Sequence, residues 1–224
     1  MSEQLLRDKA YNAIKQKIVT LEYDMGQQLV EGDISSQLDL GRTPIREAIQ
    51  QLAREGLVVI IPRKGVYISD ISMWEFQKLM ETRAMLELYC IREAVKLITP
   101  NKIADLRNLF SHARSLAKTR NITELLDIDR KFHEGIVGVL DNPYINEIAT
   151  RVYDLIVRTW YLSFKRRPVE ELNKTVDEHL RILDALEAGD ATAAEQAALN
   201  HLEQFQEKVF RKPFQNRMVL KTGT

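Results

Sequence analysis

The stretch from residue 29 to residue 68 constrains the fold more strongly than any other part of the chain. Its residues indicate two short helices, a turn, a third helix with Thr43 as its cap and Pro44 as its first residue, and a hairpin with a basic tip. A threonine oxygen satisfies free N–H groups at a helix start, and the fixed φ of proline suits the first helical position. This order of elements predicts a winged helix-turn-helix.

One face of the third helix is suited to duplex DNA. The opposite face carries an apolar stripe at helical spacing, formed by Ile45, Ala48, Ile49 and Leu52. Arg42, Arg46 and Gln50 therefore point outward together. A guanidinium can make two hydrogen bonds to guanine in the major groove, or clamp a phosphate. The alternative is a solvated helix face, and the hairpin that follows favours DNA binding over it.

The hairpin has its cations at the turn. Two apolar, β-branched runs flank the segment Pro62-Arg63-Lys64-Gly65, which is typical of two strands joined by a tight turn. Arg63 and Lys64 can lie along phosphates or enter the minor groove, and Gly65 permits close approach of its backbone. We expect this hairpin to be the wing.

The same residues resemble a known family. The segment Gly41-Arg42-Thr43-Pro44-Ile45-Arg46-Glu47-Ala48, followed by Leu52, Glu55, Gly56, Leu57 and the basic turn, is similar to the N-terminal domain of the GntR family of bacterial transcription regulators. The resemblance implies DNA contacts from Arg42, Thr43 and Arg46 on the recognition helix, and from Gly65 at the wing tip. Gly41 stands where many relatives carry Ser, and Gly32 stands near the position where some relatives carry a DNA-contacting Arg on the preceding helix. The operator sequence is therefore not implied.

Composition sets the number of domains. A chain of 224 residues with 45% hydrophobic content exceeds what the DNA-binding segment uses, and its formal charge of zero excludes a nonspecific nucleic-acid coat. We expect a DNA-binding domain over 4–71, a second domain over 72–212, and a flexible tail over 213–224. The lone cysteine, Cys90, and the lack of a long apolar run favour a cytoplasmic protein without membrane spans.

The second domain is predicted to be an all-α, antiparallel helical bundle, which makes the chain mainly α. Every long segment after residue 72 has a helical period, and capping or breaking residues separate the blocks. The expected helices lie near 73–98, 101–118, 123–140, 143–166, 168–187 and 191–210.

Three of the four histidines lie on the apolar stripes of different predicted helices: His133, His179 and His201. Asp129 precedes His133 by four residues, so both side chains project from one face of one helix. A carboxylate on an apolar face is costly to bury unless a positive group meets it. One divalent cation would satisfy all four groups. In the alternative interpretation, each histidine is a hydrogen-bonded core residue and Asp129 is its partner.

The zinc-protease pattern HExxH is absent. Glu134 follows His133, but position 137 is Val instead of a second histidine. This removes the main support for a metallohydrolase. A metal-dependent enzyme with an accessory winged-helix domain remains the alternative function at this stage.

A polar residue also interrupts the apolar stripe of the first bundle helix. Arg83 falls within that stripe, and a buried guanidinium needs an anion. Glu87, one turn further on, can supply it. Alternatively, Arg83 helps to hold the carboxylate of a small ligand whose other oxygens complete the coordination of the metal.

These residues resemble the FCD ligand-binding domain of the FadR branch of the GntR family, in a six-helix form similar to the VanR subgroup. The resemblance rests on the segment from Asp129 to His133, on Glu178-His179 and on His201, and it spans residues 74 to 210. It implies that the metal ligands are Asp129, His133, His179 and His201. It also implies a pocket arginine at Arg83, with further pocket candidates at Arg130 and Arg158.

The function implied is that of a transcription regulator, more often a repressor in this family. We expect a homodimer that binds a palindromic double-stranded DNA operator. A small carboxylate effector would bind beside one divalent transition metal per chain, and Zn, Ni, Mn and Fe all suit the ligand set. No catalysis is implied.

Overall fold

The computed structural model describes residues 3–210 of the chain, and side chains from residue 4 to residue 207. This part separates into two compact units, divided between Ser72 and Met73. The tail expected over 213–224 lies outside the described residues. Among the described helices, none is both long and apolar enough to cross a membrane.

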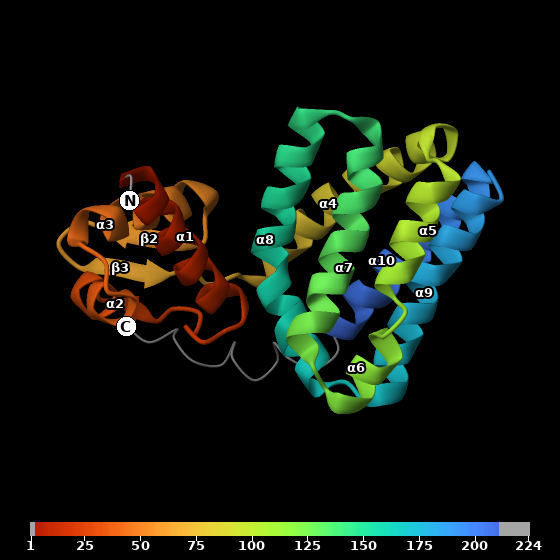
Figure 1. Cartoon of the computed structure of the whole chain (residues 1–224). Helices are drawn as coiled ribbons and strands as arrows, with labels where there is room; N and C mark the ends of the chain where they lie inside the picture. Colours follow the sequence, from red (N-terminus) through yellow and green to blue (C-terminus); the bar gives the residue numbers. More distant parts are fainter. Residues whose placement is uncertain (1–2, 211–224) are drawn as a thin grey trace. The chain divides into compact units, whose positions relative to one another are not determined.

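The first unit is a small helical domain with a three-stranded sheet (Figure 1). Its elements are α1 (Glu3–Val19), β1 (Gln28–Leu29), α2 (Glu31–Leu38), α3 (Arg42–Glu55), β2 (Val58–Ile61) and β3 (Gly65–Ile68). The strand order is β1-β3-β2 and both pairings are antiparallel, with Val58 opposite Ile68 and Ile61 opposite Gly65. This is the winged helix-turn-helix that the sequence predicted.

The apolar stripe of α3 forms the centre of this unit, as predicted. Its four members are buried against α1, whose buried face holds Ala10, Ile14 and Ile18. The predicted start of α3 was wrong, because the helix begins at Arg42 and Gly41 is its N-cap, without a side-chain cap. Proline is tolerated anywhere in the first turn, where N–H groups lack helical partners, so Pro44 did not fix the first residue.

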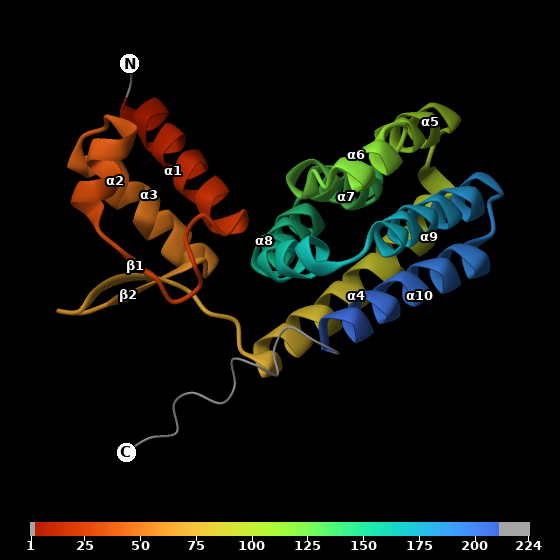
Figure 2. The same ribbon diagram turned by 90° about the horizontal axis from the view of Figure 1, so that it is seen from below.

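The second unit is an all-α bundle (Figures 1 and 2). Its elements are α4 (Met73–Leu97), α5 (Pro100–Leu109), α6 (Ala113–Thr119), α7 (Ile122–Val137), the 3-10 turn η1 (Gly138–Leu140), α8 (Pro143–Arg166), α9 (Val169–Glu187) and α10 (Ala191–Phe210). Helix α10 packs against α4 and α9, and α7 packs against α4 and α8. Side-chain oxygens of Thr99, Asn121 and Asn142 cap α5, α7 and α8.

One predicted helix is two helices. The block expected over 101–118 breaks between α5 and α6, so the described bundle has seven α-helices where the sequence suggested six. Phe110 lies at the break and is buried, with its ring stacked on His179 and edge-on to Phe132. The turn thus places an aromatic ring over the centre of the bundle, a tertiary contact that helical periodicity does not report.

Candidate functional site

Four buried side chains from three helices meet in the bundle. Asp129 and His133 come from α7, His179 from α9 and His201 from α10, and none is more than 6% exposed. One potential ligand atom from each residue lies within 4.8 Å of all the others. The predicted metal ligands are therefore brought together.

The spacing of these atoms suits a small cation. His179 Nε2 lies 3.1 Å from Asp129 Oδ1 and 3.4 Å from His133 Nε2, and His133 Nε2 lies 3.9 Å from Asp129 Oδ1. One point lies about 2 Å from all three atoms, which is the length of a Zn–N or Zn–O bond. The spacing of these three atoms thus fits a first-row divalent metal.

Contacts on the outer side of each imidazole fix its orientation. The three Nδ1 atoms pair with the Thr175 carbonyl (2.8 Å, His179), with Glu178 Oε2 (3.0 Å, His201) and with Glu87 Oε1 (3.3 Å, His133). An Nδ1–H donated to an acceptor leaves the Nε2 lone pair free to bind a metal, which is the usual arrangement around metal-bound histidines. His179 and His201 have such an acceptor within hydrogen-bond distance of Nδ1, and Glu87 lies near Nδ1 of His133.

The protonation states also suit a metal. Burial lowers the pKa of His201 to about 4, with the nearby His179 adding to the effect, and burial together with Arg83 lowers the pKa of His133 well below its ordinary value. Burial opposes ionisation of Asp129, but the contact with His179 and the positive charge of Arg83 hold its pKa well below the usual range. Neutral imidazoles and an ionised carboxylate are the forms that bind metals.

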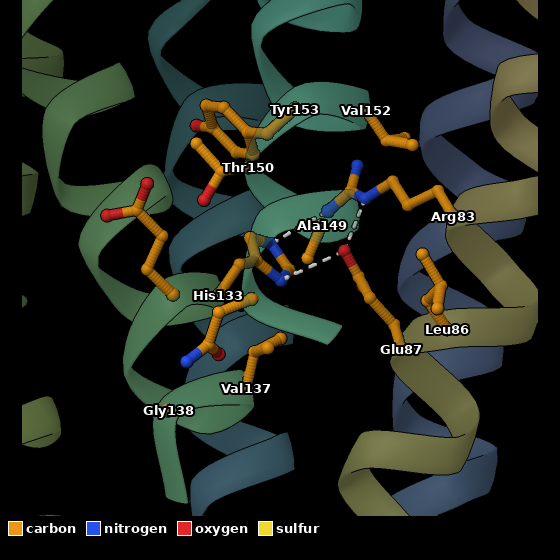
Figure 3. Close-up of a pocket in the computed structure, with 12 residues that line it drawn as sticks. Arg83, Leu86, Glu87, His133, Val137, Gly138, Ala149, Thr150, Val152 and Tyr153 are labelled. Carbon is orange, nitrogen blue, oxygen red and sulfur yellow. Dashed lines mark hydrogen bonds and ion pairs between the residues drawn. The ribbon is translucent and has the colours of Figure 1, made fainter. Parts of the chain in front are cut away.

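Arg83 of α4 reaches the same cluster. Its Nε donates to Glu87, its Nη2 lies 2.8 Å from His133 Nε2, and its guanidinium stacks on the Trp160 ring at 4.2 Å. Nη1 is buried and makes no hydrogen bond within the described residues. Figure 3 shows Arg83 and Glu87 extending toward His133. Glu87, the anion that the sequence suggested for Arg83, is thus in contact with it. The Nη1 group of Arg83 remains without a hydrogen bond among the described residues.

A cavity of about 310 Å³ adjoins the cluster (Figure 3). It is lined by Arg83, Leu86, Glu87, His133, Glu134, Val137, Gly138, Asn146, Ala149, Thr150, Val152 and Tyr153. Its volume is at the lower end of small-molecule sites. His133 belongs both to the metal cluster and to the wall of this cavity, so a molecule in the cavity would lie beside the cluster.

The other two arginines proposed for the pocket do not line this cavity. Arg130 of α7 forms ion pairs with Glu134 at 2.8 Å and with Asp154 at 2.7 Å. Arg158 of α8 is completely buried. Sequence reasoning also missed Glu178 as the partner of His201. The one sequence signal for this role of Glu178 was its position directly before His179.

The proposed DNA-binding residues lie on the first unit. Arg42, Thr43, Arg46 and Gln50 are exposed on α3, and Arg63 and Lys64 are exposed at the turn between β2 and β3. Arg46 lies 3.4 Å from Glu31 of α2. Gly65 has a φ of +117°, and a Cβ there would lie 2.9 Å from the Gln28 side chain. Glycine at this position is thus required by the turn itself.

Two family models match the chain. The model of the FCD domain matches residues 78–204, and the model of bacterial regulatory proteins of the gntR family matches residues 6–68. The chain belongs to the GntR family and carries an FCD domain. The gntR-family match lies within the first structural unit, and the FCD match lies within the second.

Relatives of this GntR protein are regulators. The HTH-type transcriptional repressor RspR of Escherichia coli K12 is 26% identical over 206 residues, covering 92% of this chain and 90% of that protein. The gluconate operon transcriptional repressor of Bacillus subtilis 168 is 23% identical over 199 residues, covering 88% and 82%. The chain is thus a DNA-binding transcriptional regulator and not the metal-dependent enzyme that the sequence had left open.

Solved structures agree on the fold. Escherichia coli McbR/YncC has a TM-score of 0.84 at 18% identity, covering 94% of this chain and 98% of that one. A GntR regulator from Rhodococcus sp. RHA1 has a TM-score of 0.78 at 20% identity, covering 91% and 97%. At these identities the likeness concerns the fold alone.

Proposed function

We propose that this GntR regulator is a metal-containing repressor that releases its operator, or rearranges on it, when a small organic acid binds the FCD domain. The observation that carries the proposal is the convergence of Asp129, His133, His179 and His201 beside a cavity that Arg83 also lines. Three imidazoles and one carboxylate suit Zn, Ni, Mn or Fe(II). When bound, such a metal acts as a Lewis acid toward a carboxylate oxygen.

The metal would contact the acid on one side, and Arg83 would hold the same carboxylate from the other side. The Nε2 lone pair of His133 can accept from Arg83 or bind a metal, but it cannot do both. With His133 bound to a metal, Nη2 of Arg83 would be free, and together with Nη1 the guanidinium would offer two N–H groups to one carboxylate. Glu87 contacts both Arg83 Nε and His133 Nδ1, and so it keeps these two side chains in register.

The helix that carries Arg83 also leads directly to the DNA-binding unit along the chain. Only residues 69–72 separate the end of β3 from the start of α4. The Ser69 hydroxyl donates to the Gly56 carbonyl at 2.7 Å, which ties this segment to the end of α3. An effector acts only through different affinities for two arrangements, typically with a coupling of about 1 to 3 kcal/mol. A shift of α4 is the most direct route for that coupling.

On DNA, α3 would be the recognition helix. Arg42, Arg46 and Gln50 would read base edges or bind phosphates, while Arg63 and Lys64 at the wing would bind phosphates. One such unit gives too small an interface for selective binding, so we propose a homodimer on a palindromic operator with half-sites about one helical turn apart. The repressor names of two relatives favour repression.

The proposal is tested by fluorescence anisotropy on an operator selected from random duplexes. Metal-free and Zn-loaded protein are titrated onto the operator with and without a panel of small acids that includes acetate, lactate, butyrate, succinate, citrate and gluconate. We expect at least one acid to change operator affinity by about 5- to 150-fold in the Zn-loaded protein and to have no effect on the metal-free protein. Operator binding that no acid changes in either form would contradict the proposal.

A further inference from the structure

Few charges line the cavity beside the metal cluster. Its charged lining residues are Arg83, Glu87 and Glu134. Most of the remaining wall is apolar or neutral, and this part consists of Leu86, Val137, Gly138, Asn146, Ala149, Thr150 and Val152. Among the described residues that line the cavity, Arg83 is therefore the one cation, and it lies at the end that His133 shares with the cluster.

Apart from a metal in the cluster, which the anchored carboxylate itself would coordinate, the described residues that line this cavity offer no second cation. Arg130 lies on the same helix as the lining residue Glu134, but it is held by two carboxylates, those of Glu134 and Asp154. Glu134 is exposed and lines the cavity, so its charge stands where the cavity meets solvent. A ligand anchored at Arg83 would extend its far end toward apolar walls and this carboxylate.

We infer that the cavity selects a short monocarboxylate with an uncharged body and rejects dicarboxylates of the same length. The inference rests on the proposed function, since it assumes that the effector carboxylate binds at Arg83 beside the metal cluster. It adds to that function a limit on the effector, namely that the part outside the bound carboxylate is uncharged.

The physical reason is the cost of a second buried charge. A carboxylate that leaves water without a cationic partner loses its hydration and gains no ion pair in return. The unpaired charge would also meet the like charge of Glu134. A methyl, methylene or hydroxyl group has no such cost, because Val137, Ala149 and Val152 offer apolar contact and Asn146 and Thr150 offer neutral hydrogen bonds.

The test uses matched acids and the full-length, Zn-loaded protein in isothermal titration calorimetry. Butyrate is compared with succinate, and 2-hydroxybutyrate with malate, since each pair differs only by a terminal methyl or carboxylate. In each pair of which a member binds, we expect the monocarboxylate to bind at least tenfold more tightly than the dicarboxylate. Glu134→Gln should narrow this ratio at least threefold, because it removes the rim charge and releases one ion pair of Arg130. Glu147→Gln, on an exposed residue of α8 outside the cavity lining, should leave the ratio unchanged.

The outcomes distinguish failure of the inferred selectivity from failure of the proposed acid site. Equal or tighter binding of the dicarboxylates would overturn the inference and leave the proposed acid site standing. A preference for monocarboxylates that Glu134→Gln does not alter would overturn the assignment of selectivity to this cavity. If neither class binds in any pair while the protein carries its metal, both the proposed acid site and the inference fail.

Discussion

Replacement of Glu178 by glutamine should weaken metal binding although it removes no ligand. Glu178 Oε2 accepts from His201 Nδ1 at 3.0 Å, and both side chains are at most 5% exposed. This contact holds the imidazole with Nε2 toward the cluster and increases its basicity. Loss of such outer partners typically lowers metal affinity 10- to 100-fold. Glutamine keeps the size and one acceptor but loses the charge, so we expect about a tenfold loss, or about 1.4 kcal/mol.

The measurement is a Zn competition titration against a chromophoric chelator at pH 7. Glu170→Gln is the matched control, since Glu170 is exposed on the same helix. A role in packing alone predicts a different result, namely a lower melting temperature of the metal-free protein with unchanged Zn affinity. That combination would refute the reasoning, as would equal Zn affinities of the Glu178→Gln and Glu170→Gln variants.

Four further outcomes concern DNA, assembly and pH. Arg42→Ala or Arg46→Ala should cost about 1 to 3 kcal/mol of specific operator binding in anisotropy titrations, and an unchanged affinity of the double variant would remove α3 as the recognition helix. Arg63→Ala or Lys64→Ala should reduce the slope of log affinity against log salt by about 1, whereas an unchanged slope would show that the wing does not bind phosphates. Light scattering should report twice the chain mass of 25.9 kDa, and a monomer that binds a palindromic site would contradict the proposed dimer. Metal-free protein should lose stability as the pH falls from about 6.5 to about 4, because burial lowers the pKa of His201 to about 4 and the unfolded chain takes up its proton first. Denaturant titrations at pH 7 and pH 5 should show this loss, with a smaller loss in His201→Gln, and equal stabilities at the two pH values would contradict it.

The elements with strong local signals could be predicted from sequence. The apolar stripe of α3 and the cations of the β2–β3 turn were visible as periodicity and turn chemistry. Asp129 and His133 share a helix at a spacing of four residues, so their common face followed from helix geometry. His179 and His201 could be added because a histidine on an apolar stripe points into the core. Their convergence at one point was a hypothesis that only a three-dimensional structure could examine.

What could not be predicted depends on contacts between helices. Arg130 was a further pocket candidate beside Arg83, yet Arg130 is held by Asp154 of a different helix and does not line the cavity. Phe110 lies at the break between α5 and α6, and its ring packs on His179 across the bundle. Glu178 lies beside His179 in sequence but pairs with His201 of the next helix. Sequence spacing within one helix carries no information about such partners.

The central claim is that Asp129, His133, His179 and His201 hold a metal, and elemental analysis of the purified protein tests it most directly. The account predicts close to one equivalent of a divalent transition metal per wild-type chain and its loss in His179→Ala. His112→Ala should retain the metal, since His112 is exposed and is the one histidine of the chain outside the cluster. Wild-type protein that contains no metal, and takes up none when Zn, Ni or Mn is added, would contradict the claim and return the three histidines to the role of hydrogen-bonded core residues.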